Sequence, residues 1–265
     1  MRVVQLSDPH LVSAPSGWVR QRPALQHWQL ALGQAALHHP DLLLITGDCC
    51  QDESWNGYAL LRDSLDLLPS KTRVAVLPGN HDHPHRLRAA LGRRAEIAPE
   101  ALRLGDWTVL ILDSHWCSHE GGQIGKGQLR WLETQLQQGN LTSGPLLVCL
   151  HHPPLPIGAP EWDRIGLDDG EELMRLLQPV PLLRAVVFGH LHQHWQGSMP
   201  ERNDVALLAC PSTLCAFPAL QACPLGRSQL PGGRLLDLSS NGRLTHTLLR
   251  WPMPKRRLNP FGQSA

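Results

Sequence analysis

Short apolar runs recur along most of the chain. Each is rich in Val, Leu and Ile and is flanked by polar residues, Gly or Pro. Continuous apolar runs of this length are typical of strands that are buried on both faces of a sheet. The runs that predict such strands are Val3–Leu6, Leu42–Thr46, Val74–Leu77, Leu146–Leu150 and Ala185–Phe188.

Between these runs the apolar residues recur at helical spacing. The pattern predicts helices over Pro23–Leu37, Tyr58–Leu68 and Gln128–Leu136. Strands that alternate with helices are typical of an α/β fold. The 265 residues, of which 42% are hydrophobic, are enough for a sizeable core.

Two turn signals add antiparallel strands to this α/β pattern. Gly105-Asp106 and Asn241-Gly242 each separate two short apolar runs, and each predicts a hairpin. The Pro-rich stretches 153–160 and 211–231 are too broken for regular elements. Long loops of this kind commonly line binding sites.

A polar cluster follows each of the predicted buried strands. The carboxyl ends of strands joined by crossover helices share one edge of a sheet, so clusters far apart in sequence are expected to converge there. The Gly residues in these clusters allow sharp turns close to a bound ion. The clusters are Asp8-Pro9-His10, Gly47-Asp48, Gly79-Asn80-His81-Asp82, His151-His152 and Gly189-His190-Leu191-His192.

The clusters offer carboxylate, imidazole and amide ligands without thiolate, a set that suits Mn, Fe, Zn, Co or Ni. Since the set is larger than one ion needs, we expect two. Two ions about 3.5–4 Å apart activate a water and neutralise charge on a phosphoryl group, which predicts phosphoester hydrolysis by a metal-bridging hydroxide. The expected ligands are Asp8, His10 and His192 for one ion, Asn80, His151 and His190 for the other, and Asp48 for both.

His81 adjoins the ligand Asn80 but is surplus to this ligand set. It is therefore free to donate a proton or a hydrogen bond to the phosphoryl or leaving oxygen. We expect Asp82 to orient it. His152 would point away from its neighbour His151 on an extended strand, which favours packing or support of a ligand.

Other residues near the clusters are expected to have structural roles. Cys49 and Cys50, beside Asp48, are interpreted as small buried residues rather than ligands. His115 and His119 lie between a strand and a helix, where a role in the site stays open. For three tryptophans in loops near the clusters, packing is favoured over stacking on a base. They are Trp18, Trp116 and Trp162.

Charge and cysteine content narrow the partners and the compartment. A net charge of +1 implies neither a nucleic-acid nor a membrane partner, so a small-molecule phosphodiester is the expected substrate. No apolar run approaches the roughly 18 residues of a spanning helix, and the chain begins directly with a strand. Seven cysteines without regular spacing favour a reducing compartment, and we expect the cytoplasm. A homo-oligomer stays open.

The motifs resemble those of the calcineurin-like metallophosphoesterase superfamily, and in particular its bacterial class III cyclic-nucleotide phosphodiesterases. The likeness runs from the N-terminus to about Arg250. Besides the polar clusters it includes Pro40-Asp41-Leu42-Leu43-Leu44-Ile45-Thr46-Gly47-Asp48, Tyr58, Gln128-Leu129-x-Trp131-Leu132, Cys210-Pro211-Ser212-Thr213 and Pro231-Gly232-Gly233-Arg234.

The resemblance implies a four-layer α/β/β/α sandwich with mixed sheets and a dinuclear site at strand ends. It implies hydrolysis of 3′,5′-cyclic AMP to AMP, with His81 at the leaving oxygen. The ligands that it implies are the seven given above. The ions expected are two divalent or mixed-valence transition metals, Fe or Mn first, with Zn, Co and Ni as alternatives.

We expect one catalytic domain over residues 1–250 and a flexible basic tail over 251–265 that contains Lys255-Arg256-Arg257. Two other functions stay open. One is a hydrolase of the same fold that acts on glycerophosphodiesters, nucleotide-diphospho-lipids or phosphomonoesters, because loops rather than ligands select the substrate. The other is a non-catalytic scaffold.

Overall fold

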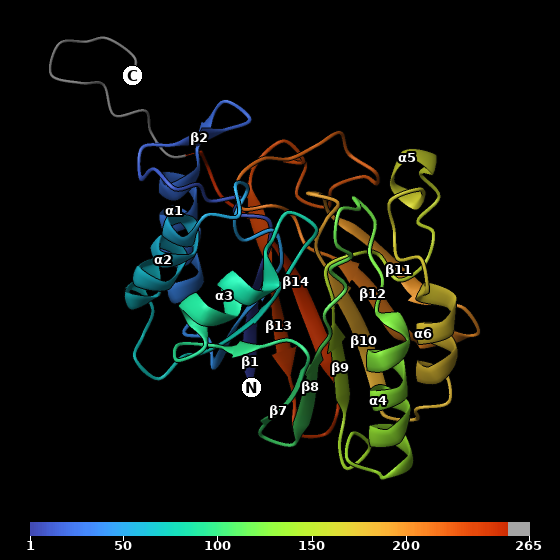
Figure 1. The fold of residues 1–265 in the computed structure, drawn as a ribbon. Coiled ribbons are helices and arrows are strands. Elements are labelled where there is room, and N and C mark those ends of the chain that lie inside the picture. Colours follow the sequence, from blue (N-terminus) through green and yellow to red (C-terminus); the bar gives the residue numbers. More distant parts are fainter. Residues whose placement is uncertain (254–265) are drawn as a thin grey trace, which may run out of the picture.

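The computed structural model describes residues 1–253. Two six-stranded sheets pack face to face, and helices cover the outer face of each (Figure 1). The predicted four-layer α/β/β/α sandwich of mixed sheets is therefore confirmed. Of the expected tail, residues 254–265 lie outside the described part. Trp251 is buried in the core between one sheet and its helices.

The first sheet has the order β14-β13-β1-β4-β5-β6. Strands β1, β4, β5 and β6 are parallel, β13 pairs antiparallel with β1, and β14 pairs antiparallel with β13. Its strands are β1 (Arg2–Leu6), β4 (Leu42–Thr46), β5 (Arg73–Leu77), β6 (Glu96–Ile97), β13 (Gly232–Leu238) and β14 (Leu244–Arg250). The segments on its outer side are α1 (Ala24–Ala36), α2 (Trp55–Ser64), η1 (Leu65–Leu67), α3 (Pro84–Leu91) and the hairpin of β2 (Trp18–Val19) and β3 (Arg22–Pro23).

The second sheet has the order β11-β12-β10-β9-β8-β7. Strands β8, β9, β10 and β12 are parallel, and the two edge strands are antiparallel to their neighbours. Its strands are β7 (Glu100–Leu104), β8 (Trp107–Ile111), β9 (Leu146–Cys149), β10 (Leu183–Phe188), β11 (Trp195–Met199) and β12 (Arg202–Ala209). The helices beside it are α4 (Gly125–Gln137), α5 (Pro160–Asp163) and α6 (Gly170–Leu177).

Alternation along the strands explains the layers. In β4, Leu42 and Leu44 enter the core between the sheets, whereas Leu43 and Ile45 pack against the helices. All four are essentially unexposed. Because both faces of such a strand are covered, its sequence is apolar throughout rather than alternating. The strands that were predicted from continuous apolar runs are the ones that carry the polar clusters.

Helices α3, α5 and α6 were not predicted from the sequence, and α5 has only four residues. Helix α3 begins at Pro84 and buries Leu87 and Leu91. Helix α6 buries Leu173 and Leu177. Each of these two helices has eight residues, so its apolar stripe contains only a few side chains and is a weak signal. No helix within residues 1–253 is both long and apolar enough to cross a bilayer.

Candidate metal centre

The polar clusters meet at the edge formed by the carboxyl ends of β1, β4, β5, β9 and β10, where the two sheets face each other (Figure 1). Six of the seven expected ligands are buried, and Asn80 is half-buried. Five have a positive φ, a conformation that costs free energy in residues other than Gly and gathers at functional sites. They are Asp8 (53°), His10 (47°), Asp48 (50°), His190 (66°) and His192 (55°).

The first group of donors consists of Asp8, His10, Asp48 and His192, whose ligand atoms all lie within 4.8 Å of one another. Nε2 of His10 is 3.0 Å from Nε2 of His192 and 3.6 Å from Oδ2 of Asp48. Nε2 of His192 is 3.5 Å from Oδ1 of Asp8. Ligands about 2.0–2.2 Å from one cation are spaced about 3 Å or slightly more from each other, as here.

The second group consists of Asn80, His151 and His190. Oδ1 of Asn80 is 3.2 Å from Nε2 of His151 and 3.1 Å from Nδ1 of His190, and the two ring nitrogens are 3.3 Å apart. Oδ1 of Asp48 lies 3.5 Å from Nε2 of His151, while its Oδ2 faces the first group. Asp48 therefore presents one oxygen to each group, as the shared position requires.

Backbone carbonyls fix the tautomers of two ligands. Nδ1 of His151 donates to the carbonyl oxygen of Thr46 (2.8 Å), and Nδ1 of His192 donates to that of Cys215 (3.0 Å). Because a carbonyl only accepts, the hydrogen of each neutral ring is on Nδ1 and the lone pair is on Nε2. Both lone pairs therefore face the donor groups, which is the usual arrangement of metal-ligating histidines.

The burial of Asp8 tests whether the donors fit cations. Both of its carboxylate oxygens are buried, and neither has a hydrogen-bond partner among the described residues. Burial raises the pKa of Asp8 to about 7, since a buried anion without a partner is costly. A cation between Asp8 and its neighbours would remove this penalty. The nitrogen and oxygen donors of both groups thus fit two transition-metal ions.

The pKa values of two ligand histidines also suit cation binding. Burial lowers the pKa of His10 to about 4 and that of His190 to about 3, so both rings are neutral at pH 7, as ligands must be. For His151, burial disfavours the charged ring, but the carboxylate of Asp48 outweighs it and raises the pKa to about 9.

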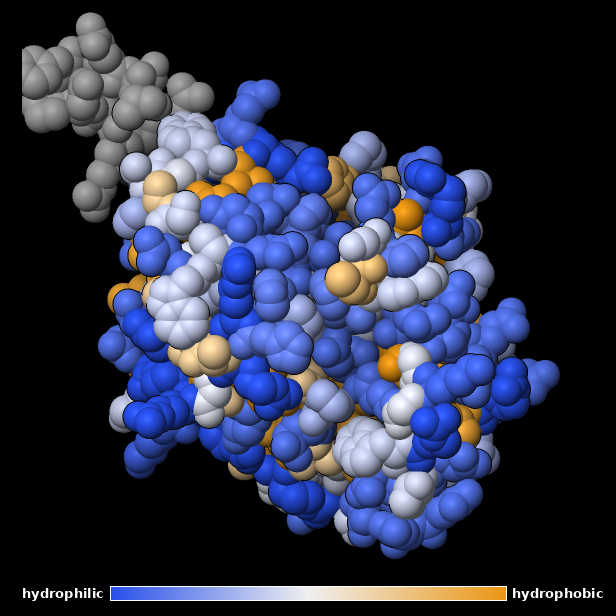
Figure 2. Space-filling model, in the orientation of Figure 1, coloured by the Kyte–Doolittle hydropathy of each residue, from blue (hydrophilic) through white to orange (hydrophobic). Residues whose placement is uncertain are grey.

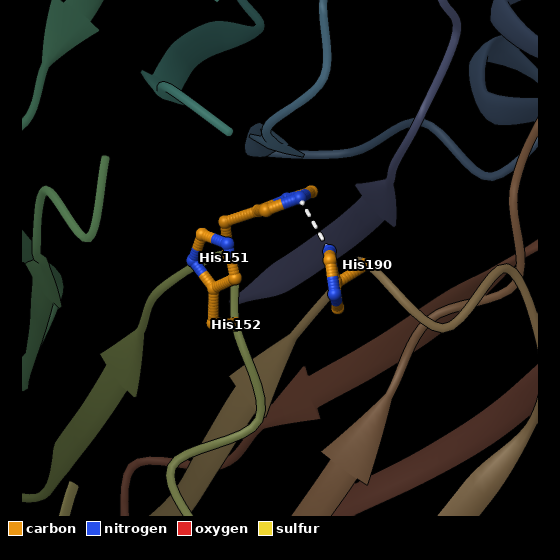
Figure 3. Close-up of side chains that lie close together, drawn as sticks. All are labelled: His151, His152 and His190. Carbon is orange, nitrogen blue, oxygen red and sulfur yellow. Dashed lines mark hydrogen bonds between the residues drawn. The ribbon is translucent and has the colours of Figure 1, made fainter. Parts of the chain in front are cut away.

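His152 lies close to His151 and His190 but binds elsewhere (Figure 3). Its Nε2 donates to the carbonyl oxygen of Glu120 (3.3 Å), and its Nδ1 accepts from the hydroxyl of Ser114 (2.9 Å). Figure 3 shows the dashed contact between His151 and His190, with the His152 ring to one side. Since both of its ring nitrogens are engaged, the structure favours the supporting role expected for His152.

His81 lies at the margin of the first group. Its ring is half-buried, with its centroid 5.2 Å from that of His10, and its backbone N–H donates to Oδ1 of Asp48 (2.9 Å). The Gln51 amide nitrogen lies 3.1 Å from Nδ1 and donates to it, which puts the hydrogen of the neutral ring on Nε2. Within residues 1–253, Nε2 of His81 makes no hydrogen bond.

The prediction that Asp82 orients His81 is wrong. The Asp82 carboxylate instead accepts backbone N–H bonds from Cys49 (2.9 Å), Cys50 (3.0 Å) and Gly79 (2.9 Å), and a bond from the Tyr58 hydroxyl (3.1 Å). Among the described residues, Gln51 rather than Asp82 contacts the His81 ring. Asp82 thus ties the loop after β4 to the loop after β5 and so positions two polar clusters.

Close packing of backbone requires Gly at two positions. A Cβ at Gly79 would collide with Asp48, and one at Gly189 would collide with Ser7 and the carbonyl of Thr46. These contacts bring the loops of both sheets within reach of the same ions. The Gly signals in the clusters therefore correspond to close approach of chain segments.

The remaining candidates lie outside the donor groups. Cys49 and Cys50 are buried, and burial raises the pKa of the Cys50 thiol to about 12, so it is protonated at pH 7. Nδ1 of His115 lies 3.0 Å from the carbonyl oxygen of Gly79, and the His119 ring stacks on Trp116. His115 thus supports the loop that bears Asn80, through a contact for which the sequence had no signal.

Comparison with known proteins identifies the family. A family model described as calcineurin-like phosphoesterase matches residues 1–194. The chain belongs to this family. Its members are hydrolases, and it is the family that the sequence motifs resemble.

Relatives match over nearly the whole chain. A probable cyclic nucleotide phosphodiesterase of Synechococcus sp. (strain WH7803) is 51% identical over 255 residues, 94% of this chain and 96% of its own length. A 3′,5′-cyclic adenosine monophosphate phosphodiesterase of Pseudomonas aeruginosa is 33% identical over 245 residues, 91% of this chain and 87% of its own length.

Solved structures share the fold at low identity. A dimetal phosphatase from Danio rerio has a TM-score of 0.64 at 12% identity, covering 95% of this chain and 99% of that chain. GAP50, described as the anchor in the inner membrane complex of Plasmodium, has a TM-score of 0.63 at 13% identity, covering 94% of this chain and 84% of that chain. These two structures support the fold alone.

Proposed function

We propose that this chain is a dinuclear-metal phosphodiesterase that hydrolyses 3′,5′-cyclic AMP, or a related cyclic nucleotide, to the 5′-nucleotide. The observation that carries the proposal is the pair of donor groups that share Asp48, with the Nε2 of His81, unbonded within residues 1–253, beside them. The names of the full-length relatives support the substrate class.

The proposed ligands are the seven residues of the two donor groups. When bound, two ions polarise the phosphoryl oxygens, lower the pKa of a water molecule and neutralise charge as the phosphodiester reacts. Fe and Mn are the ions proposed first, with Zn, Co and Ni as alternatives, because the donors are nitrogen and oxygen atoms. In the proposed site Asp48 belongs to both ligand sets.

His81 stabilises the leaving group by a hydrogen bond in this proposal. The Gln51 amide holds the ring with its hydrogen on Nε2, which is the nitrogen that faces substrate. As the bond between phosphorus and the ribose 3′-oxygen breaks, Nε2–H donates a hydrogen bond to that oxygen and stabilises its negative charge. The oxygen of a water becomes bonded to phosphorus, the water gives up a proton to solvent, and the 3′-oxygen takes one up from solvent.

The proposal extends to the whole described chain. We assign catalysis to a domain over residues 1–250, with a small-molecule phosphodiester rather than nucleic acid as substrate, consistent with a net charge of +1. The seven cysteines are free, which favours a reducing compartment, and we place the enzyme in the cytoplasm.

The experiment that tests this function is a substrate panel with metal-reconstituted protein. It compares kcat/KM for cyclic AMP, cyclic GMP, a glycerophosphodiester, bis(p-nitrophenyl) phosphate and p-nitrophenyl phosphate. We expect a cyclic nucleotide to have the highest kcat/KM. Cleavage of bis(p-nitrophenyl) phosphate with no cleavage of either cyclic nucleotide, under every divalent metal tried, would leave a phosphoesterase of a different specificity.

A further inference from the structure

Three segments that carry no proposed ligand surround the metal centre. They are the β2–β3 hairpin, the segment around α5 and the long loop 211–231, and all three lie at the end of the sandwich where the ligand-bearing strands end (Figure 1). Each brings a side chain to an aromatic contact at the centre. The side chains are Arg20, Trp162 and Phe217.

Two of these residues contact one ligand of each donor group. The Phe217 ring stacks on the ligand His192, with centroids 4.4 Å apart and planes at 24°. The Trp162 ring meets the ligand His190 edge to face, at 5.6 Å and 87°. The two aromatic rings also contact each other at 5.5 Å. We call Trp162 and Phe217 the aromatic wall.

Phe217 is fixed in this wall by its backbone and by its neighbours. The Gln193 side chain donates to the carbonyl oxygens of Phe217 and Ser228 (3.0 Å for Ser228), and Arg250 donates to the Gln193 amide oxygen (2.9 Å). The guanidinium of Arg20 lies over the Phe217 ring, 4.8 Å from its centroid. With His192 and Arg20 both against it, the Phe217 ring has little surface left for a ligand.

Trp162 packs at the margin of the core between the second sheet and its helices. It lies on α5, a helix of four residues in which no residue is buried, and its side chain stays half-exposed. A role in packing alone does not require an indole to remain exposed beside a cluster of polar ligands. On the face shown in Figure 2 the hydrophobic residues occur in small groups within a mostly hydrophilic surface, so this face has no broad apolar patch that would suggest a protein or lipid partner.

The chemistry of a cyclic nucleotide matches this arrangement. Its phosphodiester belongs at the metal centre, and its ribose carries a flat base a few ångströms away. Stacking of a base on an aromatic side chain contributes about 1–3 kcal/mol per base. We propose that Trp162, positioned by Phe217, stacks on the base of the substrate and makes the site prefer nucleotides to other phosphodiesters. This inference rests on the proposed function and names the part of the substrate that the aromatic wall binds.

The test removes the indole and compares substrates with and without a base. Trp162→Ala should raise KM for cyclic AMP roughly 10–100-fold, the effect expected from a lost base stack. Hydrolysis of ribose 3′,5′-cyclic phosphate, which has no base, should be unchanged. Trp162→Phe keeps a ring and should restore most of the affinity. Trp131→Ala on the distant helix α4 is the matched control and should leave the ratio of the two substrates at the wild-type value.

A second readout does not depend on turnover. AMP and ribose 5-phosphate are titrated by calorimetry into metal-loaded wild type and Trp162→Ala. We expect AMP to bind more tightly than ribose 5-phosphate to wild type and the two to bind alike to the variant.

The outcomes separate this inference from the proposed function. Equal losses for the two cyclic substrates in Trp162→Ala, or no loss for either, would overturn the stacking role while leaving the phosphodiesterase in place. If the wild type cleaves neither cyclic nucleotide, the proposed function fails. The titrations still test whether the aromatic wall binds the base. Equal affinity of wild type for AMP and ribose 5-phosphate would then overturn it.

Discussion

The donor groups follow strands of two sheets, whereas the rim residues Arg20, Trp162 and Phe217 come from a tight hairpin turn, a four-residue helix and a long loop. Strand ends are fixed by ladder hydrogen bonds and by cores on both sides of each sheet. The rim segments have few such constraints. Loops can therefore vary in substrate recognition while a rigid scaffold keeps the ligands in place.

The two regions are nevertheless joined at one point. His192, a proposed ligand, donates to the carbonyl oxygen of Cys215 in the rim loop, and its ring stacks on Phe217. Substitutions in the donor groups should therefore abolish chemistry, and those in the rim should change the choice of substrate.

The largest effect is expected for Asp48→Ala. Because one oxygen of Asp48 faces each donor group, its loss should prevent both ions from binding as a pair and reduce kcat/KM to below about a thousandth of wild type. Asp204→Ala, at an exposed aspartate, is the control and should keep full activity. Activity near that of wild type in Asp48→Ala would show that the groups do not share this residue.

His81→Ala should lower kcat roughly 10²–10⁴-fold without loss of metal, as expected for a missing hydrogen-bond donor at the leaving oxygen. The effect should depend on the leaving group. A p-nitrophenyl ester, whose leaving group needs little protonation, should lose less than cyclic AMP. Equal losses for both substrates, measured by steady-state kinetics, would count against a role for His81 at the leaving oxygen.

Asp8→Asn should have opposite effects on stability with and without metal. In chelated protein the neutral amide replaces a buried carboxylate whose oxygens lack partners within residues 1–253. At pH 8, above the Asp8 pKa of about 7, we expect the free energy of unfolding to rise by about 1–3 kcal/mol.

In metal-loaded protein the same change removes a ligand and should destabilise the fold. The measurement is denaturant unfolding with and without chelator. Destabilisation of equal size in both states would contradict a role for Asp8 in holding a cation.

The smallest effect is expected for Cys49→Ser and Cys50→Ser. Both thiols are buried, and Cys50 donates to the carboxylate of Asp52 (3.2 Å) rather than facing a donor group. Metal content should be unchanged and activity should stay within about twofold of wild type, since Ser has nearly the same shape as Cys. Loss of an ion in either variant would show that a thiolate is a ligand.

Much of the fold was predictable from residues that obey simple patterns. The buried strands, such as Leu42–Thr46, have a continuous apolar sequence because both faces are covered. The hairpin turns at Gly105 and Gly242 have the positive φ that favours Gly. Helix α3 was not predicted because its apolar stripe is short and charged residues interrupt it.

The donor groups were predictable because their ligands follow strands that end at one edge. Their supports were not. His151 and His192 are oriented by carbonyl oxygens of Thr46 and Cys215, and a carbonyl carries no signal in the sequence. The contact of Trp162 with Phe217 joins a short helix to a long loop, and it depends on how these segments fold over the site.

The central claim is that the two donor groups hold two ions through a shared Asp48. Elemental analysis of active, unchelated wild-type protein tests it most directly, with Asp48→Ala measured in parallel. We predict two transition-metal ions per wild-type chain and loss of the pair in the variant. One ion or none in fully active wild-type protein would contradict the dinuclear site.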